Sequence, residues 1–145
     1  MVGTIRLVIE ISRTAYAEMV SQALDGYPLE ACGLIAGPPD SSGGVGDRAA
    51  VFYPCTNMAE SARVYTIDPK DHLRAEQDAD DRDFEINGVV HSHTHSEPYP
   101  SPTDVASAPD PSWHYVILSL KREGPEVRSY RIIEGEIVSE PIAII

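Results

Sequence analysis

Basic residues are scarce in this chain, where 11 lysines and arginines face 23 aspartates and glutamates. The formal net charge is −12, and much of the acid falls between Asp68 and Glu85. Such a surface repels the phosphates of nucleic acids and of anionic membranes, so we expect neither as a partner. Long apolar runs are also missing, because none approaches the roughly 18 residues that indicate a membrane span.

Cysteine is equally scarce, with Cys32 and Cys55 as the only two in the sequence. Two cysteines do not make a disulfide framework, so reduced thiols are the default. The N-terminus lacks a basic segment followed by a long apolar core and a small-residue cleavage site. Together these features predict a cytoplasmic protein. Cys32 is two positions from Glu30, which invites a metal-ligand interpretation, but a small buried core residue is the stronger one.

The chain does contain enough apolar sequence for one globular domain. It has 145 residues, 42% of them hydrophobic, without repeats or long linkers, so residues 1–145 are expected to share a single core. The pattern predicts helices over residues 12–24 and 68–81, and strands over residues 6–11, 30–37, 49–53, 86–90, 115–120, 127–133 and 137–144. Early alternation of helices and strands followed by a late run of strands predicts an α/β fold, a mixed β-sheet flanked by helices.

The chemically informative segment is HSHTHSEPYPSPTD, from His91 to Asp104. His91 and His93 follow the apolar run 86–90, and side chains two positions apart leave a strand on the same face. One metal ion would then receive two imidazole nitrogens. After seven intervening residues, Ser101 opens a Ser-x-x-Asp segment that is typical of a helix start. Asp104 could supply an oxygen ligand, and a fourth position left for water is typical of catalytic zinc sites.

Each part of this pattern also has a plainer interpretation. A Ser-x-x-Asp sequence is most often only a capping box at a helix start. Three histidines in five residues can be a solvated tract with adventitious metal affinity. The combination carries the prediction, because His-x-His at a strand end, the Ser-x-x-Asp segment and a separate glutamate, Glu30, occur together.

On these residues the chain resembles the JAMM (MPN-plus) metalloproteases, whose motif is a distant glutamate, His-x-His, seven residues and Ser-x-x-Asp. The positions of that motif are all filled here, by Glu30, His91, His93, Ser101 and Asp104. The resemblance covers nearly the whole chain, and within the family it is strongest to the small actinobacterial branch of Mec-type hydrolases. It implies a JAMM/MPN-like fold with cytidine-deaminase-like layers and one Zn²⁺ per chain.

The resemblance also implies a role for each residue of the motif. His91, His93 and Asp104 are expected to hold zinc, which lowers the pKa of a bound water toward about 7. Glu30 is expected to pass the proton of that water to the leaving amine. Ser101 is expected to donate a hydrogen bond to the oxyanion of the tetrahedral intermediate.

Other polar residues have weaker claims. Many JAMM relatives carry proline after the second histidine, whereas this chain has Thr94 and His95. His95 could be an exposed loop residue, a group that supports a metal ligand, or a substitute ligand. We favour the exposed loop residue. His114 opens a predicted strand and is expected to be packed and satisfied. A segment without strong periodicity, where a substrate tail could dock, holds three candidates for substrate binding: Asn57, Arg63 and Tyr65.

The sequence lacks the residues that two other kinds of zinc enzyme require. Zinc deaminases need a Pro-Cys-x-x-Cys after their His-x-Glu, and no cysteine follows residue 55. The sequence His-Glu-x-x-His is absent, which excludes a helical zincin site. A non-catalytic MPN-type scaffold is an alternative from another class, but such relatives are expected to lose ligands.

The resemblance implies a zinc metallopeptidase of cysteine biosynthesis. It would hydrolyse the C-terminal amide of a small ubiquitin-like sulfur-carrier protein and release free cysteine from the carrier's Gly-Gly end. The alternative is a deconjugating isopeptidase for a ubiquitin-like protein modifier, which needs the same zinc chemistry. The identity of the carrier and the oligomeric state, a homodimer included, are left open by the sequence.

Overall fold

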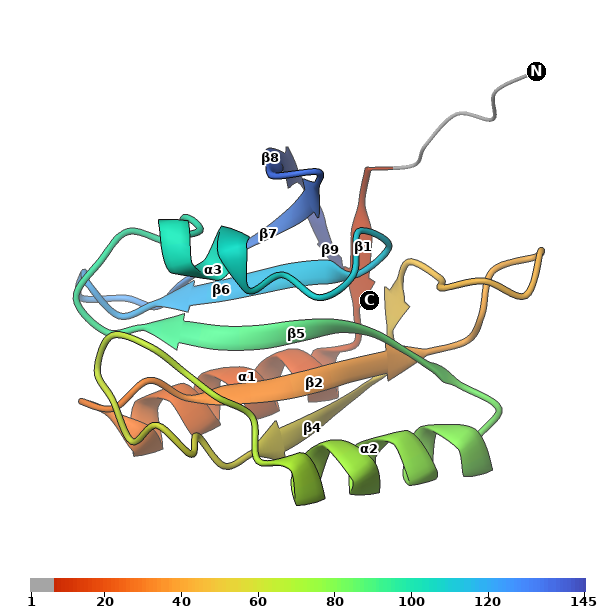
Figure 1. Cartoon of the computed structure of the whole chain (residues 1–145), viewed down its shortest axis with the longest axis horizontal. Coiled ribbons are helices and arrows are strands. Elements are labelled where there is room, and N and C mark those ends of the chain that lie inside the picture. The colour runs from red at the N-terminus through yellow and green to blue at the C-terminus, as the bar shows by residue number, and fades with distance from the viewer. Residues whose placement is uncertain (1–6) are drawn as a thin grey trace.

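Two β-sheets form the frame of the part of the chain that the structure, a computed structural model, describes, namely residues 7–145 (Figure 1). The larger sheet contains β2 (Cys32–Gly37), β4 (Val51–Cys55), β5 (Glu85–His93), β6 (His114–Ser119), β7 (Glu126–Ile133) and β8 (Glu136–Glu140). Its order is β4-β2-β5-β6-β7-β8, with β5 and β6 parallel and the other neighbours antiparallel. The smaller sheet is parallel and contains, in order, β3 (Arg48–Ala49), β1 (Ile9–Ile11) and β9 (Ile142–Ile144).

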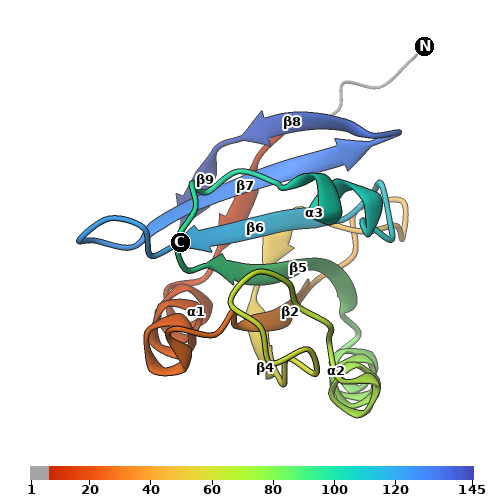
Figure 2. The same ribbon diagram turned by 60° about the vertical axis from the view of Figure 1, so that its left-hand side comes forward.

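Three helices accompany these sheets: α1 (Arg13–Gly26), α2 (Pro69–Asp81) and α3 (Pro102–Ala106). Ser12 caps α1 by accepting a hydrogen bond from the Ala15 N–H at 3.1 Å, and Asp68 caps α2 by accepting from the Lys70 N–H at 2.9 Å. Helices α1 and α2 lie on opposite sides of strands β2 and β4 (Figure 2). The predicted mixed sheet flanked by helices is confirmed. No described helix combines the length and the apolar character needed to cross a membrane.

Strand alternation sorts the side chains of β5 between two cores on opposite faces of the larger sheet. Val90 belongs to the core that contains α1, and Val89 belongs to the core that contains residues of α2. His91 and His93 share the parity of Val89, so both imidazoles leave β5 on the face where the loop 56–68 and α3 lie. The predicted placement of both histidines on one face of a strand is therefore confirmed.

Several predicted strands have wrong bounds, and three of them lie in or next to the smaller sheet. The strand expected over residues 137–144 is divided at Pro141, which has no N–H to donate, and the chain passes from β8 into β9 of the other sheet. The strand expected over residues 49–53 joins parts of β3 and β4, which are separated by Ala50 and also lie in different sheets. Of the strand expected over residues 6–11, position 6 lies outside the described residues, and β1 begins at Ile9.

His114 connects the two sheets. Its buried ring places Nδ1 2.7 Å from Glu140 Oε2 at the end of β8 and Nε2 3.0 Å from Asp47 Oδ1, just before β3. Both ring nitrogens therefore have partners, which confirms the prediction of a packed and satisfied histidine. His114 pairs with Gly88 at the start of the β5–β6 ladder, whereas His93 lies at its other end.

Candidate active site

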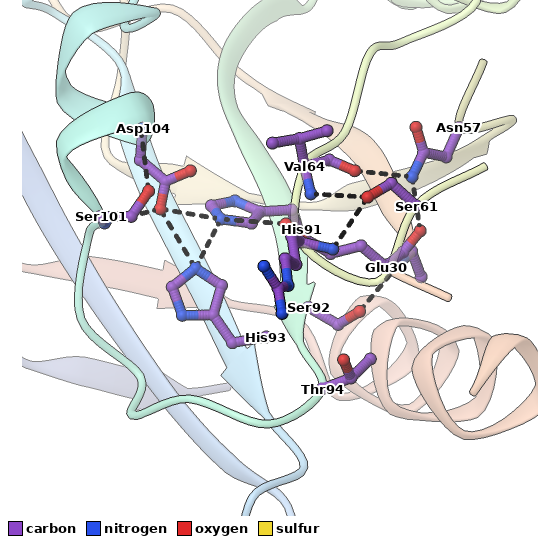
Figure 3. Close-up of polar contacts among 12 residues, drawn as sticks. Glu30, Asn57, Ser61, Val64, His91, Ser92, His93, Thr94, Ser101 and Asp104 are labelled. Carbon is purple, nitrogen blue, oxygen red and sulfur yellow. Dashed lines mark hydrogen bonds and ion pairs between the residues drawn. The ribbon is translucent and has the colours of Figure 1, made fainter. Parts of the chain in front are cut away.

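Three polar atoms from β5 and α3 converge at the end of β5 (Figure 3). His91 Nε2 and His93 Nε2 lie 3.1 Å apart, and Asp104 Oδ2 lies 3.2 Å from the first and 3.1 Å from the second. A tetrahedral ion with ligands at about 2.0 Å holds its ligand atoms about 3.3 Å apart. This nearly equilateral triangle of two imidazole nitrogens and one carboxylate oxygen therefore fits a single metal ion.

Neighbouring groups orient the two imidazoles. His93 Nδ1 lies 2.8 Å from the carbonyl oxygen of Glu97, so it donates its proton there and leaves the lone pair of Nε2 for a metal. Tyr65 stacks on His91, with ring centroids 4.4 Å apart. Burial lowers the pKa of His91; burial also lowers the pKa of His93, but hydrogen bonds to Asp104 and to the Glu97 carbonyl outweigh it and raise that pKa.

The start of α3 delivers the carboxylate. The Ser101 N–H donates to Asp104 Oδ2 at 2.8 Å, and the Asp104 N–H donates to Ser101 Oγ at 3.0 Å, which makes a capping box. Burial raises the pKa of Asp104, but hydrogen bonds with His91 and His93 outweigh it and hold the pKa well below its usual range. The capping box and the approach to the histidines therefore use the same carboxylate oxygen.

Glu30 approaches the triangle from another side (Figure 3). Its Oε1 lies 3.7 Å from His91 Nε2, and its side chain is 2% exposed. Burial raises the pKa of Glu30 to about 7, an effect that His93 reduces and Asp104 increases. A carboxyl group with a pKa near neutrality can both accept a proton and return it.

Two carboxylates are candidates for the third ligand of a metal. Glu30, His91 and His93 form a buried group whose donor atoms lie within 4.8 Å of one another, and this group could hold an ion. Asp104 Oδ2 lies closer to both histidines, at 3.1 and 3.2 Å. We give more weight to these shorter and more even separations, because they match a tetrahedral ligand set and leave Glu30 free for proton transfer.

The backbone of Glu30 belongs to a loop contact rather than to a strand. The prediction that a strand begins at Glu30 is wrong, since β2 begins at Cys32. The Glu30 N–H donates to the carbonyl oxygen of Ser61 at 2.7 Å, and the Glu30 carbonyl accepts from Asn57 Nδ2 at 2.9 Å. The loop 56–68 thus occupies the hydrogen-bonding groups that a sheet neighbour would use, which is why the strand starts later.

Asn57 shapes this loop. Its Nδ2 also donates to the Val64 carbonyl at 3.1 Å, and its Oδ1 accepts from the N–H groups of Ala59 and Thr66 at 3.0 and 2.9 Å. The amide is therefore fully used within the protein, and we infer that Asn57 positions the loop beside Glu30. Direct binding of a substrate tail by Asn57, Arg63 or Tyr65 stays a prediction.

Two cavities adjoin the triangle. One, of about 380 Å³, is lined by Asp104 and largely by apolar side chains, Tyr65 and Trp113 among them. The other, of about 520 Å³, is lined by Glu30, Ala62, Arg63, His93, His95, Ser96 and Ser101. An extended substrate can thus lie across the site with one part beside apolar residues and the other beside polar residues.

His95 and Cys32 lie outside the ligand triangle. His95 is exposed, with Nδ1 2.9 Å from Thr94 Oγ1 and Nε2 3.4 Å from the Tyr27 hydroxyl, so the interpretation as a loop residue is confirmed. Cys32 is buried and pairs with Cys55 across β2 and β4. Both thiols are free, and burial first of all raises the pKa of Cys32 to about 12, which keeps it protonated.

Thr94 makes a structural contact that was not predicted from the sequence. It is buried, and its hydroxyl donates to the carbonyl oxygen of Ala62 at 3.2 Å, which joins the end of β5 to the loop 56–68. The signal was present in the sequence, because Thr94 stands where many JAMM relatives carry proline. Proline has no side-chain donor and could not make this bond.

Comparison with known proteins shows to which family the chain belongs. A family model described as prokaryotic homologs of the JAB domain matches residues 12–133. The chain belongs to this JAB family. It is 36% identical over 144 residues to the CysO-cysteine peptidase of Mycobacterium tuberculosis, a match that covers 99% of this chain and 94% of that protein. It is 29% identical over 116 residues to the Desampylase of Haloferax volcanii, which covers 77% of this chain and 80% of that one.

Solved structures place this JAB-family chain among the same folds. A Desulfitobacterium hafniense protein with a known solution structure is 31% identical, with a TM-score of 0.80 and coverage of 94% of this chain and 92% of that chain. A JAB1/MPN domain protein from Archaeoglobus fulgidus is 19% identical, with a TM-score of 0.55 and coverage of 93% and 99%, and shares the fold. The JAB/MPN-type fold implied by the JAMM resemblance is confirmed.

Proposed function

We propose that this protein is a metallopeptidase that removes a C-terminal cysteine from a small ubiquitin-like sulfur-carrier protein ending in Gly-Gly. The observation that carries the proposal is the triangle of His91, His93 and Asp104 with buried Glu30 beside it. Similarity along nearly the whole chain to a CysO-cysteine peptidase supports this substrate class. Two free buried thiols agree with the cytoplasmic location that we also propose.

Zinc is the metal that we propose for the site. Two imidazole nitrogens and one carboxylate oxygen, with room for a fourth ligand, form a donor set typical of catalytic zinc. Held by His91, His93 and Asp104, the ion would lower the pKa of a water molecule toward about 7 and polarise the scissile carbonyl. Glu30 accepts the proton of the attacking water and gives it to the leaving amine, which its burial and near-neutral pKa suit.

Ser101 combines two roles. Its Oγ accepts the Asp104 N–H at 3.0 Å, which leaves the hydroxyl proton free to be donated elsewhere. Ser101 also lines the cavity that contains Glu30. We infer that its hydroxyl donates to the oxyanion formed when the carbonyl is attacked.

A second candidate function is cleavage of an isopeptide bond in a conjugate of a ubiquitin-like modifier. The similarity to the Desampylase of Haloferax volcanii favours it. The same site residues would carry this reaction, because only the leaving group differs, a lysine ε-amine in place of the α-amine of cysteine.

We expect the purified enzyme to remove one cysteine from a carrier protein whose Gly-Gly end bears it, and to act poorly on lysine-linked ubiquitin-like conjugates. The mass of the carrier, followed over time, checks this, with the Glu30→Gln enzyme as the inactive control. Rapid cleavage of lysine-linked conjugates without loss of cysteine from the carrier would contradict the proposal and favour deconjugation.

We expect Ser101→Asp to keep the helix cap and to lose about 10²- to 10³-fold in turnover, because a carboxylate can cap a helix but has no proton to give an oxyanion. Ser101→Ala should lose both functions, with a stability cost of about 1 kcal/mol for the missing cap. Thermal unfolding and turnover, measured on the same samples, separate the two. Full activity in Ser101→Asp would leave Ser101 with a capping role alone.

A further inference from the structure

The cavity of about 520 Å³ that Glu30 lines, called the polar cavity below, also contains a cationic side chain, Arg63, which has no role in the proposed proton transfer. Arg63 is exposed and lines this cavity together with Glu30, His93 and Ser101. Its guanidinium has no ion-pair partner among residues 7–145, although the whole chain has 23 acidic residues against 11 basic ones. An unpaired arginine at the mouth of a buried acidic site is available to bind an anion from outside the protein.

Other basic side chains near this cavity already have partners. Lys121 and Arg122 both bind Glu97, at 3.1 and 2.5 Å. His95, which also lines the cavity, has its two ring nitrogens within hydrogen-bonding distance of Thr94 and Tyr27. Arg63 is thus the side chain of this cavity with an uncommitted positive charge.

The position of Arg63 is set by bonds to catalytic elements on both sides. Ser61 and Ala62 directly precede Arg63. The Ser61 carbonyl accepts a hydrogen bond from the Glu30 N–H at 2.7 Å, and the Ala62 carbonyl accepts one from the Thr94 hydroxyl at 3.2 Å. The Arg63 N–H itself donates to Ser61 Oγ at 3.0 Å. The backbone that carries the guanidinium is therefore fixed relative to Glu30 and to the end of β5.

The direction in which a substrate lies follows from proton transfer. Glu30 protonates the leaving amine, so the leaving residue has to enter the cavity that Glu30 lines, and the carrier occupies the apolar cavity beside Asp104. In a C-terminal amino acid the carboxylate oxygens lie within about 4 Å of that amine. The carboxylate therefore enters the same cavity as Arg63. A lysine ε-amine is followed by methylene groups and brings no carboxylate to this place.

We propose that Arg63 binds the free α-carboxylate of the residue that is released and so selects a C-terminal amino acid over a lysine-linked conjugate. This inference rests on the proposed function. A guanidinium can form two parallel hydrogen bonds to a carboxylate, which fixes the orientation of the leaving residue as well as its charge. Recognition of the α-carboxylate by Arg63 then explains how a short protein can release only one terminal residue.

A matched pair of substrates tests the proposal: the carrier ending in Gly-Gly-cysteine, and the same carrier ending in Gly-Gly-cysteinamide, whose terminal charge is removed. We expect kcat/KM of the unaltered enzyme to be about 10- to 100-fold higher for the acid, the range expected for hydrogen bonds to a charged group. Arg63→Gln should lose this factor on the acid and change little on the amide. Arg63→Lys, which keeps the charge without the planar fork, should fall between them.

A binding measurement gives a readout that does not depend on turnover. In the Glu30→Gln background, calorimetry should show tighter binding of the acid than of the amide by a similar factor, and adding Arg63→Gln should remove the difference. Arg74→Gln is the matched control, since Arg74 is an exposed arginine on α2 that pairs with Asp71 and is absent from the polar cavity. It should keep the preference for the acid.

Two outcomes would overturn the inference in distinguishable ways. Equal rates on acid and amide by the unaltered enzyme, or an equal loss on both in Arg63→Gln, would remove the role of Arg63 and leave the proposed function standing. Absence of cleavage of both substrates by fully metal-loaded enzyme would overturn the proposed function and this inference with it.

Discussion

Glu30→Gln is expected to retain its metal ion while its turnover falls by at least about 10²-fold, the usual contribution of a general base. Glutamine has nearly the same shape as glutamate but cannot accept the proton of water. The metal should stay because the most even set of donor atoms, His91, His93 and Asp104, does not include Glu30. Elemental analysis and turnover on the same preparation measure both quantities.

Asp104→Ala is the matched counterpart of this variant. Glu30 and Asp104 are the two carboxylates near the histidines, and only one of them is expected to be a ligand. Asp104→Ala should lose the metal and also the hydrogen bond from the Ser101 N–H, whereas Ser101 Oγ can still accept the backbone N–H of residue 104. Loss of metal from Glu30→Gln with retention in Asp104→Ala would reverse the two assignments.

His91→Ala is expected to lose both the metal and the activity. Unaltered protein purified without added metal should contain one zinc ion per chain, whereas a site with two of its three protein ligands should contain far less. His95→Ala serves as the control, because His95 lies two positions from His93 but outside the triangle, and it should keep stoichiometric zinc. Zinc retained in His91→Ala would mean that the ion binds elsewhere.

The short-range part of the site was predictable because local geometry determines it. A strand places His91 and His93 on one face by its alternation, and a capping box orients Asp104 through the backbone of Ser101. The position of Glu30 has no such local cause. It depends on bonds to Ser61 and Asn57 in a loop without periodicity, so in the sequence only the resemblance to a motif indicated its role.

The fold shows the same division between local and distant causes. Periodicity predicted most strands and both long helices, because it reports which side of an element is buried. It does not report to which sheet a strand belongs, and so it missed the passages between sheets at Ala50 and Pro141. The connection of Thr94 to Ala62, which sets the place of Arg63, likewise joins segments about 30 residues apart.

The smaller sheet has a consequence for the order of events on the ribosome. Strand β1 lies beside β9, with Ile9 opposite Ile142 and Ile11 opposite Ile144, and Ile142 packs on the core that contains α1. Of the described strands, β9 is synthesised last, and it completes a core that already contains β1. Until it emerges, Ile9 and Ile11 lack this neighbour. Removal of β9 would therefore first destabilise β1, which is far from β9 in the sequence.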